Sequence, residues 1–403
     1  MGNLSVGAIL IILSLTVVCS YLFSILSGFI KVPAVLLLLI TGIAFRYFSD
    51  KYNWGLFFPE KISEILGVIG LMMIVLEAGL DLRLSKNKIV LIRNSFLAAI
   101  FIFLLSVAGI SAVLLFWLHE AFIKCMVYAI PLSIMSSAIV IPSIQHLSES
   151  NKEFLIYEAS FSDIVGILAF NYCLGTELMS LHAVGGFLLN VVLSVILSLI
   201  FSVVLFLILA RSPISVKFFL VFALLLLLYE GGKMLGLPSL LLILIFGLLM
   251  KNWDLLKIPI VKKWLRAKEA DEINKDLHSI TAETSFLIRT FFFLIFGFSI
   301  DINLISQSEV ILIGTAIIGI LLLLRYLYLK CFLRQNVYPE IIFIPRGLVT
   351  ILLFYQIPNS FKLSSFNNGI LFYVILGTTL IMMIGLMFYK KKKNFDISET
   401  LKM

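Results

Sequence analysis

Long runs of apolar residues, separated by short polar stretches, repeat along the whole chain. A helix needs about 20 predominantly apolar residues to cross the hydrocarbon core of a bilayer, and this criterion predicts about thirteen transmembrane helices. Their expected positions are residues 4–28, 33–48, 62–82, 91–117, 123–146, 153–174, 185–210, 215–230, 236–251, 283–300, 308–328, 338–356 and 367–389. The pattern therefore predicts an all-α polytopic membrane protein.

Basic residues orient these helices, because cytoplasmic loops of membrane proteins carry an excess of Lys and Arg. With the run Lys390–Lys393 in the cytoplasm, an odd number of spans places the N-terminus outside. Most of the 31 basic residues then fall on the cytoplasmic side, Arg325 among them. The expected location is the bacterial cytoplasmic (inner) membrane.

The expected domain organisation is simple. Residues 1–393 form one transmembrane domain, and residues 394–403 form a short cytoplasmic tail. The charged stretch 252–282 has helical spacing and is interpreted as a cytoplasmic linker that lies along the membrane surface. No soluble domain is expected.

Composition agrees with a membrane protein. Hydrophobic residues make up 61% of the chain and charged residues 13%, with a mean hydropathy of +1.11. A soluble domain is about a quarter charged. The net charge of +8 lies in short loops, so the expected partner is the lipid bilayer and no nucleic acid. We expect no cofactor, because the four cysteines lack metal-ligand spacing.

Ionisable side chains inside the predicted spans are informative, because each costs at least about 2.5–3.5 kcal/mol on insertion scales. They are Glu77, Glu158, Asp163, Arg289 and Arg346. Asp163 lies near the middle of its span. Burial disfavours the charged form of a carboxyl group, so such a group can exchange a proton for a cation. Asp163 is therefore the expected site for Na⁺ and H⁺, and a structural aspartate paired with an arginine is the alternative.

Glu158 lies five residues before Asp163 and points roughly 140° away from it on an ideal helix. We therefore expect Glu158 to form a structural salt bridge, with Arg346 as the best candidate partner and Arg289 as the second. Ser162 either contacts the ion or bonds the backbone of its own helix. Glu77 is either interfacial or part of the ion pathway.

Two spans are predicted to be interrupted. Pro131 and Pro142 bracket Ser136 and Ser137, and Pro345-Arg346-Gly347 breaks the span 338–356. Proline removes a backbone donor, and interrupted helices coordinate ions near the midplane of transporters. Ser136 and Ser137 are thus candidate ion-site residues. The two spans are seven apart in order, so they cross the bilayer in opposite directions, as inverted repeats require.

Several stretches resemble the sodium/proton exchanger (monovalent cation:proton antiporter) family. They are EASFSD at 158–163, SSAIV at 136–140, FFFLIFGFSIDI at 291–302 and PRGLVTI at 345–351. The resemblance covers roughly residues 5–390. Ser162 stands where the family usually has Asn or Asp, and the first interruption lacks the family's Thr-Asp-Pro form.

The resemblance implies a dimerisation part, hence a homodimer, and a mobile six-helix core in which the two interrupted helices cross. It implies that Asp163 binds both ion and proton, and that Glu158 pairs with Arg346. We expect a secondary antiporter that exchanges Na⁺ (or Li⁺ or K⁺) for H⁺. The alternative is a transporter-fold sensor or ion-conducting subunit that acts with a partner protein. An organic-anion symporter would need more polar residues at mid-membrane, and no nucleophile–base pair indicates an enzyme.

Overall fold

The computed structural model describes residues 6–30, 32–52, 60–84, 88–144, 147–174, 181–211, 218–253, 267–333 and 338–389. These residues form helices and connecting segments, and no strand occurs among them. The helices are α1 (Val6–Ile30), α2 (Ala34–Lys51), α3 (Glu60–Asp81), α4 (Ile89–Leu118), α5 (Phe122–Ser133), α6 (Ser137–Ser143), α7 (Glu149–Cys173), α8 (Leu181–Arg211), α9 (Phe218–Met234), α10 (Ser239–Lys251), α12 (Ala267–Ser299), α13 (Ile302–Ile305), α14 (Ser308–Tyr328), α15 (Leu348–Tyr355) and α16 (Asn368–Phe388), with the short turns η3 (Leu329–Leu333), η4 (Glu340–Ile342) and η5 (Asn359–Phe361).

The all-α prediction is confirmed, and each predicted span coincides with one helix or with an interrupted pair. By length and composition alone, five helical stretches in the described ranges are able to cross a membrane. They are Ile89–Leu118, Phe122–Ser143, Asn274–Ser299, Ser308–Phe332 and Asn368–Phe388. The count of about thirteen spans stays a prediction.

The predicted linker is helical in its later part. Residues 267–282 are the first half of α12 and continue without a break into the apolar half. The helical spacing predicted for this stretch is thus seen in residues 267–282, and its place at the membrane surface stays a prediction. Residues 254–266 of the linker, the run Lys390–Lys393 and the tail lie outside the described residues.

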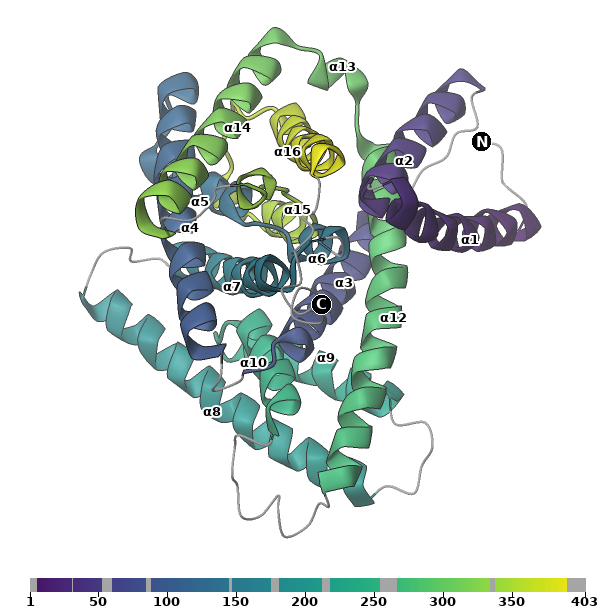
Figure 1. Cartoon of the computed structure of the whole chain (residues 1–403), viewed down its shortest axis with the longest axis vertical. Coiled ribbons are helices and arrows are strands. Elements are labelled where there is room, and N and C mark those ends of the chain that lie inside the picture. Colours follow the sequence, from purple (N-terminus) through teal and green to yellow (C-terminus); the bar gives the residue numbers. More distant parts are fainter. Residues whose placement is uncertain are drawn as a thin grey trace, which may run out of the picture.

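Packing contacts sort the helices into two groups (Figure 1). In the first group, α4 packs against α5, α7 and α14, while α16 packs against α14, α6 against α7 and α15 against α5. In the second, α12 packs along α2 and α3, and α10 packs against α3, α8 and α9. Contacts of α7 with α10 and of α15 with α3 join the two groups.

Side chains at two helix starts fix where the most buried helices begin. The Ser148 hydroxyl accepts a hydrogen bond from the Asn151 amide at 3.4 Å and starts α7. The Asn367 side chain accepts one from the Gly369 amide at 2.8 Å and starts α16. Both satisfy backbone donors that a helix start leaves free.

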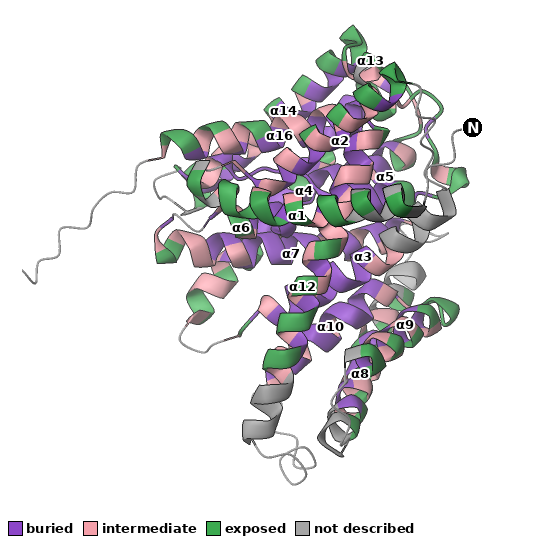
Figure 2. Ribbon diagram, turned by 90° about the vertical axis from the view of Figure 1, so that its right-hand side faces the viewer, coloured by how far each residue is buried: buried purple, intermediate pink, exposed green. Residues whose placement is uncertain are grey.

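The outermost helices carry exposed apolar side chains, whereas α5, α6 and α7 are largely buried (Figure 2). The exposed residues of α1 and α8 include Ile11, Leu15, Leu22, Ile25, Phe29, Leu189, Val192, Ile196 and Ile200. Large exposed apolar faces mark contact with lipid or with another protein.

Glycines bring two helix pairs of the second group into backbone contact. A Cβ added to Gly297 on α12 would lie 2.5 Å from the Leu39 carbonyl oxygen on α2. A Cβ added to Gly79 on α3 would lie 2.7 Å from the Leu244 carbonyl oxygen on α10. Small residues at such crossings are typical of membrane helices, because they let the two backbones approach.

Replacement of Gly79 by valine should destabilise the protein, because the new side chain meets backbone that cannot rotate away. Over-packing of this kind costs about 1–3 kcal/mol, which should lower the midpoint of thermal unfolding in detergent. Gly185→Val on α8 is the control, since no atom of the described residues lies within 4 Å of a Cβ added there. Equal midpoints for the two variants would contradict the tight crossing.

Candidate functional site

Two helices are interrupted near the centre of the first group. The helix α5 ends at Ser133 and α6 begins at Ser137, which leaves residues 134–136 extended or irregular. Residues 343–347 form a second non-helical segment, between η4 and α15. The two interruptions touch, because the Ser136 amide donates a hydrogen bond of 2.9 Å to the Pro345 carbonyl.

Gly347 permits this close approach. A Cβ at Gly347 would lie 2.5 Å from the Ser136 hydroxyl oxygen and 2.9 Å from an Ile139 methyl group. Any larger residue would have to push the two interruptions apart. The glycine of the stretch PRGLVTI is thus needed for its small size.

Asp163 lies on α7 against the first interruption, with only 4% of its surface exposed. Its Oδ2 accepts a hydrogen bond of 2.5 Å from the Ser137 hydroxyl. Its Oδ1 and the Ser136 hydroxyl are buried and have no hydrogen-bond partner in the described part of the chain. A carboxylate oxygen in this setting has capacity for a proton or for a hard cation, which prefers oxygen ligands.

Ser162 makes a different kind of contact from its neighbour Asp163. Its hydroxyl accepts a hydrogen bond of 2.9 Å from the Met135 amide, within the first interruption. An interrupted helix leaves such amides without their usual carbonyl partners, and burial of an unpaired amide is costly. The structure therefore places Ser162 on the backbone of the interruption and Asp163 on the hydroxyl of Ser137.

Glu158 forms a buried, two-pronged salt bridge with Arg325 on α14, at 2.7 Å and 2.8 Å. The prediction that Arg346 is its partner is wrong, as is the second candidate, Arg289. Arg325 also donates through Nε to the Glu340 carbonyl at 2.6 Å. A planar guanidinium matches a carboxylate in this way, and both side chains are only about 2% exposed.

Arg346 instead caps backbone carbonyl groups. Its Nε donates to the Leu132 carbonyl at 2.6 Å and its Nη1 to the Ile344 carbonyl at 3.0 Å. Leu132 lies in the last turn of α5, where a helix favours positive charge. The arginine thus links the second interruption to the end of the helix before the first.

The arginines also line a cavity with room for about one water molecule. Its polar lining comprises Glu158, Arg325, Arg346, Ser133 and Ser162. The salt bridge, the capping arginine and the hydroxyl on the first interruption therefore share one small polar space next to Asp163.

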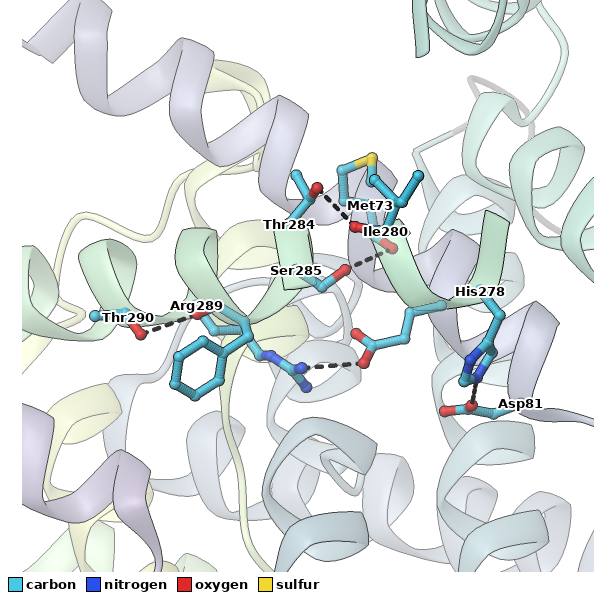
Figure 3. A network of polar contacts seen from close by, with 10 residues as sticks. Met73, Asp81, His278, Ile280, Thr284, Ser285, Arg289 and Thr290 are labelled. Atoms are coloured by element: carbon cyan, nitrogen blue, oxygen red, sulfur yellow. Dashed lines mark hydrogen bonds and ion pairs between the residues drawn. The ribbon is translucent and has the colours of Figure 1, made fainter. Parts of the chain in front are cut away.

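Glu77 belongs to a separate polar network between α3 and α12 (Figure 3). Its Oε1 accepts a hydrogen bond of 3.0 Å from Arg289, and one turn on, Asp81 lies 2.7 Å from the His278 ring nitrogen. Ser285 between them donates to the Met73 carbonyl at 3.1 Å. Of the predicted site residues, Ser136, Ser137, Ser162 and Asp163 come together, and Glu77 has no hydrogen bond to any of them in the described chain.

Arg325 is the site residue that the sequence analysis misplaced. The charge distribution counts Arg325 with the cytoplasmic basic residues, although Arg325 lies inside the predicted span 308–328. Its immediate surroundings, LLLLRYLY, are apolar on both sides. That context was the available signal, since a basic residue so placed needs a buried acidic partner.

Comparisons with known proteins concern the family and the fold of the chain. Residues 13–389 match the family model described as sodium/hydrogen exchanger, transmembrane. The fold is similar to the sodium proton antiporter MjNhaP1 from Methanocaldococcus jannaschii at pH 8, with TM-score 0.70 and 19% identity over 95% of this chain and 98% of that one. An electron-microscopy structure of MjNhaP1 gives TM-score 0.67 and 18% identity over 96% and 100%. Among curated proteins, nothing matches.

A double-mutant cycle should identify the true partner of Glu158. Glu158→Gln and Arg325→Met should each destabilise the protein by about 3–5 kcal/mol, because each leaves one buried charge unpaired. Together they should cost less than their sum, and thermal unfolding in detergent measures this coupling. The surface pair Glu149 and Lys152, 3.9 Å apart, is the control and should couple by under about 1 kcal/mol. Stronger coupling of Glu158 to Arg346 than to Arg325 would contradict the assignment.

Proposed function

This chain belongs to the sodium/hydrogen exchanger family, and on that premise we propose that it is a secondary antiporter that exchanges Na⁺, or Li⁺ or K⁺, for H⁺ by alternating access. Asp163 binds the cation and the proton in competition. The buried, half-satisfied carboxylate at the first interruption is the observation that carries this proposal.

Competition follows from the chemistry of one carboxylate. An ionised Asp163 is costly in a dry core, because burial disfavours the charged form. A proton on Oδ1 or a monovalent cation beside it removes that cost, and the two cannot occupy the same oxygen. The Ser137 hydroxyl, which bonds Asp163, and the Ser136 hydroxyl, which has no partner among the described residues, are the groups that would complete the cation's oxygen shell.

A one-for-one, electroneutral cycle is the simplest consequence. Of the three acidic residues expected inside the membrane, Glu158 is already paired with Arg325 and Glu77 with Arg289. Of the three, Asp163 alone has no ionic partner among the described residues. A single exchangeable carboxylate carries one proton or one monovalent cation per crossing.

In the proposed mechanism, the two helix groups move relative to one another. The first group contains both interruptions and Asp163, while glycine crossings tie α2 to α12 and α3 to α10 in the second. Displacement of the first group against the second would expose Asp163 to each side in turn. This division supports the expected mobile core and the expected crossing of the interrupted helices.

The proposal includes the setting expected from the sequence. The chain forms a homodimer in the bacterial cytoplasmic membrane, with its N-terminus outside and its C-terminus inside. Exposed apolar faces on α1 and α8 suit contact with lipid or a second subunit (Figure 2). The resemblance to the family, which includes a dimerisation part, favours the second subunit on one of these faces.

Asp163→Asn should abolish cation-driven proton movement, at least about 100-fold, because an amide neither ionises nor carries a proton. The measurement is the pH change inside liposomes that contain the purified protein, after addition of Na⁺, Li⁺ or K⁺. The matched control is Glu149→Gln on the same helix, since the Glu149 side chain is 83% exposed. Full exchange by the Asp163→Asn protein would contradict the proposal that Asp163 binds the cation and the proton.

A further inference from the structure

In both interruptions, a buried backbone amide donates a hydrogen bond to a side-chain hydroxyl from another helix. The Met135 amide in the first interruption donates to the Ser162 hydroxyl at 2.9 Å. The Arg346 amide in the second donates to the Thr378 hydroxyl at 3.2 Å. In each case the hydroxyl comes from the next α-helix after the interrupted span, α7 after α5–α6 and α16 after η4–α15.

The correspondence extends to neighbouring residues. Ser162 precedes Asp163, and Thr378 precedes Thr379. Ser136 directly follows Met135, and Gly347 directly follows Arg346. These two residues face one another where the interruptions touch.

Other parts of the chain follow the same repeat. Pro33 precedes α2 and Gly42 lies within it, at the spacing that Pro238 and Gly247 have relative to α10. Gly42 lies against Gly297 of α12, and Gly247 against Gly79 of α3. The pairing of the second span with the tenth, and of the ninth with the third, is the exchange that an inverted repeat with a seven-span offset produces.

We propose that Thr378 is a positioning residue for transport: its hydroxyl holds the second interruption in place through the Arg346 amide, as the Ser162 hydroxyl holds the first. This inference rests on the proposed antiport function. Thr378 touches neither ion nor proton and acts through Arg346.

The reason lies in where Arg346 sits. Its side chain caps the Leu132 carbonyl at the end of α5, and the preceding carbonyl, that of Pro345, accepts the Ser136 amide. Loss of an acceptor for a buried amide makes that segment rearrange in search of another partner. A shift of Arg346 would displace both the end of α5 and Ser136, which border the Asp163 site.

The adjacent threonine supplies a matched control. Thr378 and Thr379 are both fully buried, and both donate to the carbonyl four residues earlier at 2.7 Å, Val374 and Ile375 respectively. Thr378 differs in that it also accepts the Arg346 amide. The Thr378 hydroxyl also lies 3.2 Å from the Ile375 carbonyl, within its own helix. Valine at either position removes one hydroxyl and preserves the branched shape, so the bond to the Arg346 amide is the contact between segments that only Thr378→Val removes.

The test compares Thr378→Val, Thr379→Val and Thr378→Ser in liposomes. We expect Thr378→Val to raise the KM for the transported cation about five- to tenfold, because the buried amide loses its acceptor. Thr379→Val and Thr378→Ser should stay within about twofold of the unchanged protein in KM. Thr378→Val should unfold at a lower temperature than Thr379→Val, because only the former leaves the buried Arg346 amide without its acceptor. Thr378→Ala replaces the valine variant if that protein does not insert.

Equal KM values for Thr378→Val and Thr379→Val would overturn the proposal, as would a Thr378→Ser protein as impaired as Thr378→Val. Hydrogen exchange of the backbone gives a readout independent of transport. The Arg346 amide should exchange faster in Thr378→Val than in Thr379→Val, and equal rates would also overturn the proposal. If the unchanged protein exchanges no cation, the antiport function fails, while the exchange rate of this amide still decides the role of Thr378.

Discussion

The hydrogen bond between the Ser136 amide and the Pro345 carbonyl joins two interrupted helices, and the rest of the site depends on it. Backbone groups in a membrane interior must find partners within the protein, because lipid offers none. Each interruption supplies part of what the other lacks, and the Arg346 guanidinium and the Ser162 hydroxyl supply more. Asp163 is placed by the result, since its donor, Ser137, is the first residue of the helix that resumes.

Charge in this core is closely balanced. Glu158, Asp163, Arg325 and Arg346 are all nearly inaccessible, and their formal charges cancel when Asp163 is ionised. A proton or a monovalent cation at Asp163 adds the same single positive charge. The two loaded forms are therefore alike in formal charge, and they differ in size and in the oxygen atoms that each engages.

The local sequence was enough to locate the helices, both interruptions and the serines near Asp163. Apolar runs, prolines and glycines determine such features through residues close by in the chain. The hydrogen-bond and salt-bridge partners of the buried polar side chains were not predictable in the same way. The sequence favoured Arg346 over Arg289 as the partner of Glu158 and placed Arg325 on the cytoplasmic side, and only three-dimensional packing brings α14 and Arg325 against Glu158. The role of Ser162 was open for the same reason, since its partner, the Met135 amide, is a backbone group on another helix. Glu77 is a further example. Its sequence context allowed a place in the ion pathway, and in the structure it pairs with Arg289 in a separate network.

The capping contacts of Arg346 make the two halves of the molecule unequal. Carbonyl oxygens at the ends of broken helices are natural ligands for a passing cation. In this chain the Leu132 and Ile344 carbonyls already accept hydrogen bonds from the Arg346 guanidinium. The second interruption therefore brings a basic side chain of its own to these carbonyls, whereas Met135, at the corresponding place in the first interruption, brings none.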